Sequence, residues 1–409
     1  MRAYERLLKY AQVNTTSCEE NEANTPSGEG EWNLARLLEE EMKELGLKNV
    51  HVDEHCYVYG WLPATEGCEG SRHLGFNSHM DTVADTGGAD THPQVIRDYD
   101  GGPIRLGDSG KVIDPELFPH LKDCKGKTIL TTDGTSVLGA DDKAGIAEIM
   151  TMCETLIREQ IPHGAISICF SPDEEIGHGA AYLDLAAFDA DLAYTVDGSA
   201  PHEVEYETFN AASAKFVFTG LSVHPGDAKG KMINAMLVAM EAAASFPPDE
   251  VPSKTEGREG FYHLTGAHGN VSEAVLEYIL RDHDAALFAK KKEKVQEVAA
   301  AINEKYGAGT VRVEVKDQYR NMAEIIAKVP EVVEIANRAI EAVGLTPVSN
   351  PVRGGTDGAQ LSFRGLPCPN LGTGGYAYHG YYEHAVAEEM DTCVQILLNI
   401  VEEFRKLPR

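Results

Sequence analysis

The stretch AISICFSPDEE, residues 165–175, joins an apolar segment to a pair of carboxylates. Its first six residues have the length and composition of a strand buried in a sheet. Glu174 and Glu175 follow where that strand would end. Open α/β sheets bind their ligands just beyond the carboxyl ends of the strands. We therefore expect both glutamates at the functional edge of an α/β sheet.

Two other apolar stretches lead into polar groups in the same way. Residues 74–76 precede His79, and residues 192–196 precede Asp197. A helix is expected to begin just after Asp142, because apolar residues then recur at helical spacing. They are Ile146, Ile149, Met150, Cys153, Leu156 and Ile157. Strands that alternate with helices predict an α/β domain with a mixed, mostly parallel sheet flanked by helices.

The same periodicity places further elements along the chain. Helices are predicted over residues 4–13, 31–45, 233–246, 285–306 and 390–407, and from Pro330 to Gly344. Strands are predicted over residues 214–219, within 261–280, and over 311–315. Gly46 directly follows the second helix and is a typical helix stop.

A chain of 409 residues is long for one core, so two domains are expected. Residues 210–320 contain strands and helices but none of the candidate metal ligands, which predicts a separate, smaller α+β domain there. Residues 1–209 and 321–409 would then form the catalytic domain. Within it, residues 85–127 are rich in Gly, Pro and Asp, and we expect an excursion with its own hairpin.

Composition excludes several classes of partner. The formal net charge of −29, without a basic stripe, argues against nucleic acid as a partner. No run approaches the roughly 20 apolar residues of a membrane span, and the N-terminus lacks a signal-peptide pattern. The eight cysteines form no Cys-x-x-Cys pair, so reduced thiols in a cytoplasmic protein are expected.

Five short segments carry the candidate chemistry. They are Asn77–Asp81, Gly139–Lys143, Pro172–Glu175, Val196–Gly198 and Tyr378–Gly380. Together they offer two histidines and three carboxylates as ligands and leave one carboxylate as a base. Such a set fits two metal ions that share a bridging aspartate, which is common equipment for amide hydrolysis. A histidine and carboxylate shell suits zinc, and manganese or cobalt also fit.

Each segment alone has a simpler explanation. Acids such as Asp141 and Asp142 are favoured at any helix N-terminus, adjacent glutamates often form a solvated turn, and Asp197 could belong to a plain turn. The final histidine could be His379 or His384. The two-metal interpretation rests on the presence of all five segments in this order.

The sequence resembles the peptidase T, or aminotripeptidase, family over essentially the whole chain. That family belongs to the clan of co-catalytic zinc peptidases that also holds aminoacylases, carboxypeptidase G and succinyl-diaminopimelate desuccinylase. The motifs that carry the resemblance are Gly75–Thr82, Leu138–Gly145, Pro172–Gly177, Val223–Gly226 and Arg353–Gly358.

The resemblance implies a role for each matching residue. His79 and Asp197 would hold one zinc, Glu175 and His379 the other, and Asp141 would bridge both. Asp81 would orient His79, and Glu174 would be the general base for a water that attacks the peptide. A His-Gly followed closely by a Glu selects His379 over His384. Relatives also have a cis peptide after the bridging aspartate.

The resemblance further implies a small-peptide substrate, in particular a tripeptide. It also implies a homodimer formed through the smaller domain, which would act as a lid. His224 in that domain would support the oxyanion. Arg281 and Arg353 are candidates for the substrate carboxylate, because a guanidinium pairs with it through two parallel hydrogen bonds. An N-acyl amino acid deacylase or a carboxypeptidase of the same clan is the alternative enzyme. A non-catalytic peptide-binding relative is less favoured, because Glu174 and every expected ligand are present.

Overall fold

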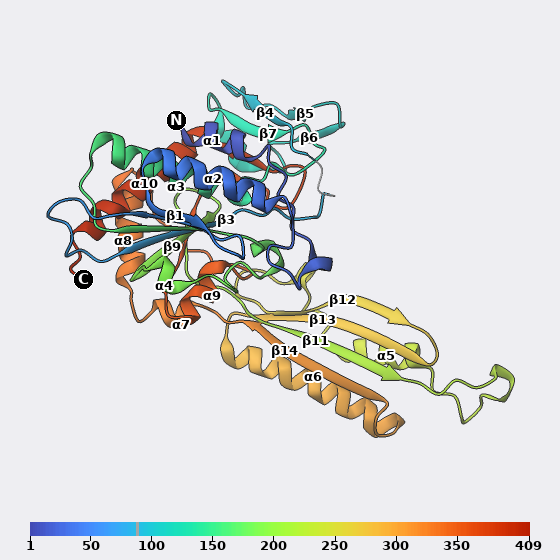
Figure 1. Ribbon diagram of the computed structural model, residues 1–409. Coiled ribbons are helices and arrows are strands. Elements are labelled where there is room, and N and C mark those ends of the chain that lie inside the picture. The colour runs from blue at the N-terminus through green and yellow to red at the C-terminus, as the bar shows by residue number, and fades with distance from the viewer. Residues whose placement is uncertain (87–89) are drawn as a thin grey trace. The chain divides into compact units, whose positions relative to one another are not determined.

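The computed structural model describes residues 1–86 and 90–409, which divide into two compact units (Figure 1). Unit 1 comprises Met1–Tyr206, Glu324–Asn350 and Thr356–Arg409. Unit 2 comprises Glu207–Ala323 and Pro351–Gly355. Residues 87–89 of the predicted excursion lie outside the described residues.

Unit 1 is built on a seven-stranded sheet in the order β1-β2-β8-β3-β9-β15-β10. The strands are β1 (Lys48–Val52), β2 (Val58–Leu62), β3 (Leu74–His79), β8 (Ile166–Ser171), β9 (Leu192–Gly198), β10 (Val204–Glu205) and β15 (Asn370–Gly372). The inner strands β8, β3, β9 and β15 are parallel, and the outer pairs are antiparallel. The predicted α/β class with a mixed sheet is confirmed.

Helices cover both faces of this sheet (Figure 1). The helices α2 (Glu31–Leu45) and α3 (Ala140–Glu159) pack on one face, and α4 (Leu185–Phe188) and α9 (Asp357–Phe363) lie on the other. The second face is sealed by an apolar cluster that includes Tyr57, Phe188 and Leu361. The other α-helices in the described part of unit 1 are α1 (Ala3–Tyr10), α7 (Ala323–Ile326, whose first residue clusters with unit 2), α8 (Glu331–Ala342) and α10 (Ala387–Arg405).

The excursion forms a small layer of its own. β4 (Pro93–Ile96) pairs with β7 (Ile129–Thr132), which joins β17 (His384–Val386) and β16 (Gly375–Tyr376). The expected hairpin is present as β5 (Ile104–Leu106) and β6 (Lys111–Ile113). Its apolar side chains are buried with those of β7 and β17. The excursion is thereby fixed to the chain segment that follows His379.

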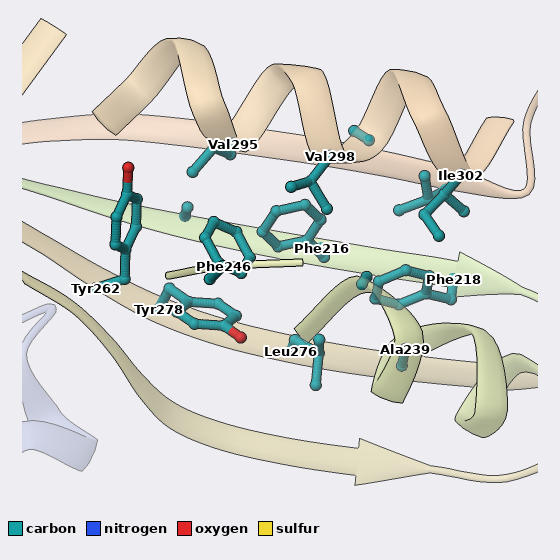
Figure 2. Packing of buried hydrophobic residues seen from close by; sticks show 14 of the residues in the cluster. Phe216, Phe218, Ala239, Phe246, Tyr262, Leu276, Tyr278, Val295, Val298 and Ile302 are labelled. Carbon is teal, nitrogen blue, oxygen red and sulfur yellow. The ribbon is translucent and has the colours of Figure 1, made fainter. Parts of the chain in front are cut away.

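Unit 2 is a four-stranded antiparallel sheet with two helices. Its order is β12 (Phe261–Gly269), β13 (Glu273–Asp282), β11 (Asn210–Thr219) and β14 (Val311–Tyr319). The helix α5 (Ala235–Ala243) contributes Ala239 to the core, and α6 (Ala285–Tyr306) contributes Val295, Val298 and Ile302; these side chains are buried in one cluster with Phe216 and Tyr278 of the sheet (Figure 2). The unit therefore has an apolar core of its own.

The predicted helices over 31–45 and 285–306 are confirmed at both ends. Gly46 stops the first with a φ of 96°, in the left-handed region that glycine adopts freely. The predicted strand region 261–280 is two strands joined by a turn. Residues 351–355, which the sequence analysis placed in the catalytic domain, cluster with unit 2, where the Val352 amide donates to Glu207. Within residues 1–86 and 90–409, no helix combines the length and apolar character needed to cross a bilayer.

Candidate metal centre

The segments with candidate chemistry meet at the carboxyl ends of the parallel strands. His79 is the last residue of β3, Asp197 lies near the end of β9, and Glu175 follows β8. Asp141 stands at the start of α3, where Asp141 and Asp142 have non-helical backbone angles and a cis peptide bond joins them. The regular helix begins after that point, as the periodicity predicted.

One group of potential ligands consists of His79, Asp141 and Asp197. One ligand atom from each residue lies within 4.8 Å of the others. The Nε2 of His79 is 2.9 Å from Oδ1 of Asp141 and 3.6 Å from Oδ1 of Asp197. The other ring nitrogen, Nδ1, is 3.2 Å from Oδ1 of Asp81. The imidazole thus presents one nitrogen to the group and the other to a supporting carboxylate.

The second group consists of Asp141, Glu175 and His379 and meets the same 4.8 Å limit. The Nε2 of His379 lies 3.0 Å from Oδ2 of Asp141 and 3.1 Å from Oε2 of Glu175. Asp141 therefore offers a different oxygen to each histidine. His384, the other candidate for this position, is buried and shares a 2.7 Å contact with His120, away from the group.

Buried negative charge dominates the electrostatics of both groups. Burial raises the pKa of Asp197 to about 8 and also raises the pKa of Glu175. Burial alone lowers the pKa of His79, but the Asp197 and Asp141 carboxylates raise it well above its usual value. Hydrogen bonds with Asp141 and Glu175 raise the pKa of His379 to about 11. The shifts of the two histidines show that the carboxylates around them favour positive charge at this site.

Glu174 and Glu175 form a single 3₁₀ turn and occupy different surroundings. Both of their backbone amides donate to the Asp81 carboxylate, at 2.9 Å from Glu174 and 3.1 Å from Glu175. Asp81 therefore touches His79 and the turn that carries the two glutamates. Burial raises the pKa of Glu174 well above its usual value, which suits a group that must both accept and release a proton.

Sequence reasoning missed two buried carboxylates that support the groups. Glu383 accepts hydrogen bonds from the amides of Gly139 and Asp141, at 2.8 and 3.0 Å. Asp142 accepts from the amide of His79 at 3.1 Å. The signal for Glu383 was available, because it is the glutamate that follows the His-Gly pair. That pattern was used only to choose between two histidines.

The candidate substrate-binding residues His224, Arg281 and Arg353 all lie in unit 2. His224 is exposed, and its Nδ1 accepts from the amide of Gly226 at 3.2 Å. Arg281 donates to the carbonyls of Ala212 and Leu280. Arg353 donates to the carbonyls of Gly257 and Glu259 and to the hydroxyl of Thr255. The two guanidinium groups are thus held in fixed positions within the unit.

The two groups of side chains fit a pair of divalent cations. Their donors are histidine nitrogen and carboxylate oxygen, the set that zinc, manganese and cobalt accept. Oε1 of Glu175 is buried and has no hydrogen-bond partner, so a ligand is the natural complement for it. One aspartate shared between two histidines is the arrangement expected of a bridge.

Three comparisons with known proteins agree with this geometry. The sequence pattern of Peptidase family M20/M25/M40 matches residues 138–403. A Peptidase T of Clostridium perfringens (strain 13 / Type A) is 49% identical over 402 residues, covering 98% of each chain. The crystal structure of aminopeptidase PepT from Bacillus cereus ATCC 10987 has a TM-score of 0.78 at 25% identity and covers 99% of this chain and 98% of that one. A dinuclear metal-binding M20 peptidase of Bacillus subtilis shares the fold, with a TM-score of 0.63, 13% identity, and coverage of 98% and 96%.

Proposed function

The chain belongs to Peptidase family M20/M25/M40, and from this premise we propose that it is a metallo-aminopeptidase that removes the N-terminal residue from tripeptides. The observation that carries the proposal is the pair of ligand groups sharing Asp141, in a chain that matches proteins named Peptidase T from end to end. Two cations placed side by side can activate a water molecule and polarise the carbonyl of a peptide bond.

In this proposal His79 and Asp197 hold one ion, Glu175 and His379 hold the other, and Asp141 bridges them. Two zinc ions are the proposed cofactors, and manganese or cobalt would also suit the ligands. When bound, the ions polarise the scissile carbonyl and make a water molecule acidic enough to attack it at neutral pH. Asp81 keeps His79 oriented, which the 3.2 Å contact to Nδ1 supports.

Glu174 is the proposed general base. Its carboxylate takes the proton of the attacking water and then delivers it to the nitrogen of the leaving amine. Two observations support this assignment: the raised pKa of the carboxyl group and the fixed backbone of its turn. Glu175, the next residue, contacts His379 instead and has the ligand role.

Unit 2 is the proposed lid and dimerisation domain. We propose that His224 supports the developing oxyanion, and that Arg281 or Arg353 binds the carboxylate of the tripeptide. The side chains of Leu237 and Met240, on one helix, are 63% and 59% exposed. Exposed apolar residues on a domain with its own core support a homodimer contact through this unit. The free cysteines, of which seven are buried, support a cytoplasmic enzyme.

A substrate panel tests the proposal. Purified, metal-loaded protein is incubated with di-, tri- and tetrapeptides, with an N-acetylated tripeptide and with N-acetyl amino acids, and the products are separated by chromatography. We expect the free tripeptide to be cleaved fastest, with release of its first residue. Faster cleavage of N-acetyl amino acids would indicate a deacylase, and release of the last residue would indicate a carboxypeptidase.

A further inference from the structure

Asp173, the residue directly before the proposed base, has an unusual backbone conformation. It is fully buried and has a φ of 56°, in the left-handed region that few residues other than glycine adopt. A residue other than glycine persists in this conformation where its surroundings hold it there. The contacts that hold Asp173 are therefore informative about how the turn of Glu174 is fixed.

The side chain of Asp173 is held by the N-terminal segment of the chain. Its two carboxylate oxygens accept from the amide of Ser27 at 3.0 and 2.9 Å, and Oδ1 also accepts from the Ser27 hydroxyl at 2.5 Å. Ser27 is 4% exposed, and its Oγ in turn accepts from the amide of Cys18 at 2.9 Å. A buried carboxylate with this many donors has a fixed orientation.

The backbone of Asp173 is held by a second buried carboxylate. Its amide donates to Oε2 of Glu31 at 3.1 Å, and the other oxygen of Glu31 accepts from the amide of Gly28 at 3.1 Å. Glu31 is the first residue of α2, is fully buried, and lies 142 residues before Asp173. Glu31 therefore ties the turn after β8 to the start of a distant helix.

Three successive backbone amides of the turn thus donate hydrogen bonds to carboxylates. The amide of Asp173 donates to Glu31, and the amides of Glu174 and Glu175 donate to Asp81. Glu31 and Asp81 come from different parts of the chain and are both fully buried. With three amides fixed in sequence, the side chains of Glu174 and Glu175 must leave the turn in fixed and different directions.

We propose that Glu31 is a positioning residue for catalysis, which together with Asp173 and Ser27 holds the turn 173–175 so that Glu174 reaches the attacking water while Glu175 reaches the metal. This inference rests on the proposed function. A general base must lie within hydrogen-bond distance of the proton that it takes, and a displacement of about 1 Å can cost about 100-fold in rate. Loosening the turn should therefore lower kcat more than it changes KM.

The test is Glu31→Gln in the full-length, metal-loaded protein. The amide nitrogen of glutamine cannot accept, so one of the two N–H donors, Gly28 or Asp173, loses its acceptor. We expect kcat for a tripeptide to fall about 10- to 100-fold, with KM within about threefold of wild type and with two metals per chain retained. Amide hydrogen exchange over residues 172–177 should become faster.

Glu41→Gln is the matched control. Glu41 lies on the same helix, is 8% exposed, and accepts from Arg6 and Lys9 rather than from the turn. The Glu41→Gln substitution should lower the unfolding temperature and leave kcat and the amide exchange of residues 172–177 unchanged.

A second pair of variants tests the side chain of Asp173. Asparagine keeps a hydrogen-bond acceptor and tolerates a positive φ, so Asp173→Asn should have a higher kcat than Asp173→Ala.

Several results would overturn the proposal. The first is a Glu31→Gln variant whose kcat lies within twofold of the wild-type value. The second is a fall in kcat no larger than that of a Glu41→Gln variant of equal stability. The third is a fall in kcat that matches a loss of bound metal. If the wild-type protein cleaves no tripeptide, the proposed function fails instead. The positioning role of Glu31 is then decided by the exchange of residues 172–177 alone, which must rise in Glu31→Gln and not in Glu41→Gln.

Discussion

Glu174 and Glu175 are chemically identical neighbours with different surroundings. Burial raises the pKa of both carboxyl groups, but Glu175 also contacts His379 at 3.1 Å and has one buried oxygen without a hydrogen-bond partner. A ligand must stay ionised, and a base must exchange its proton during the reaction. The contacts of Glu175 therefore support its proposed role as a ligand, and Glu174 is the carboxylate proposed as the base.

Glu174→Ala should separate these roles. We expect kcat to fall about 100- to 10,000-fold, because general acid–base groups typically contribute that much. The metal content, measured by elemental analysis, should stay equal to that of wild type because Glu174 is not a proposed ligand. Full activity in this variant would remove Glu174 from the scheme.

A second prediction at this scale concerns stability rather than catalysis. Glu205 in β10 lies away from the ligands, and burial together with Glu203 raises its pKa to about 7. The folded state then binds a proton more tightly than the unfolded state, so stability should fall as pH rises from about 4.5 to about 7. Glu205→Gln should be more stable than wild type at pH 8, by about 1–3 kcal/mol, and nearly equal at pH 4.5. Urea titrations at pH 4.5 and pH 8 measure the free energy of unfolding of both proteins. The same difference between variant and wild type at the two pH values would contradict the prediction.

At the scale of elements, the segment between β11 and α5 carries His224. Its 3₁₀ turn, Pro225–Asp227, is exposed, and the hydrogen bonds that the structure gives His224 are local: its Nδ1 accepts from the Gly226 amide and its carbonyl from the Asp227 amide. A residue with so few contacts contributes little to folding, which makes it a clean target for mutation.

We expect His224→Ala to lower kcat about 100- to 1,000-fold, as removal of an oxyanion donor typically does. The unfolding temperature and the metal content should stay the same, because the side chain is exposed and is not a proposed ligand. Steady-state kinetics with a tripeptide measure the effect. Unchanged kinetics would exclude the oxyanion role.

Elements with local signals could be predicted from the sequence, and those that depend on distant partners could not. The helix over 31–45 has a regular apolar face and a glycine stop, and its bounds are correct. β15 is only three residues long and is a strand because it pairs with β9 and β10. The helix α9 was not predicted, because its seven residues are too few to show a clear helical period. Three of the candidate ligands, His79, Glu175 and Asp197, follow strands that the sequence reveals, whereas His379 lies between two short strands that it does not, and only the family resemblance singled it out.

At the scale of the whole molecule, the ligand groups draw on residues from His79 to His379. No single segment contains a complete group, so the metal centre forms only when unit 1 is folded. Because the ligands come together only in the folded state, bound metal should stabilise unit 1 against unfolding.

Removal of metal with a chelator should therefore abolish activity and lower the unfolding temperature. Asp141, Glu175 and Asp197 would then lie close together without a neutralising cation. We expect a loss of at least about 3 kcal/mol for tightly bound ions, recovered on addition of zinc. Calorimetry before and after chelation measures it. Identical thermograms and activity would contradict a metal centre.

The position of β15 between β9 and β10 has a consequence for synthesis on the ribosome. When the nascent chain has completed unit 2, the large sheet still ends in the unprotected edge of β9, a surface prone to unwanted pairing. Only translation past residue 372 covers that edge, and His379 emerges shortly afterwards. Closure of the sheet and arrival of the last proposed ligand thus nearly coincide, so the chain completes the site only when its large sheet can also be completed.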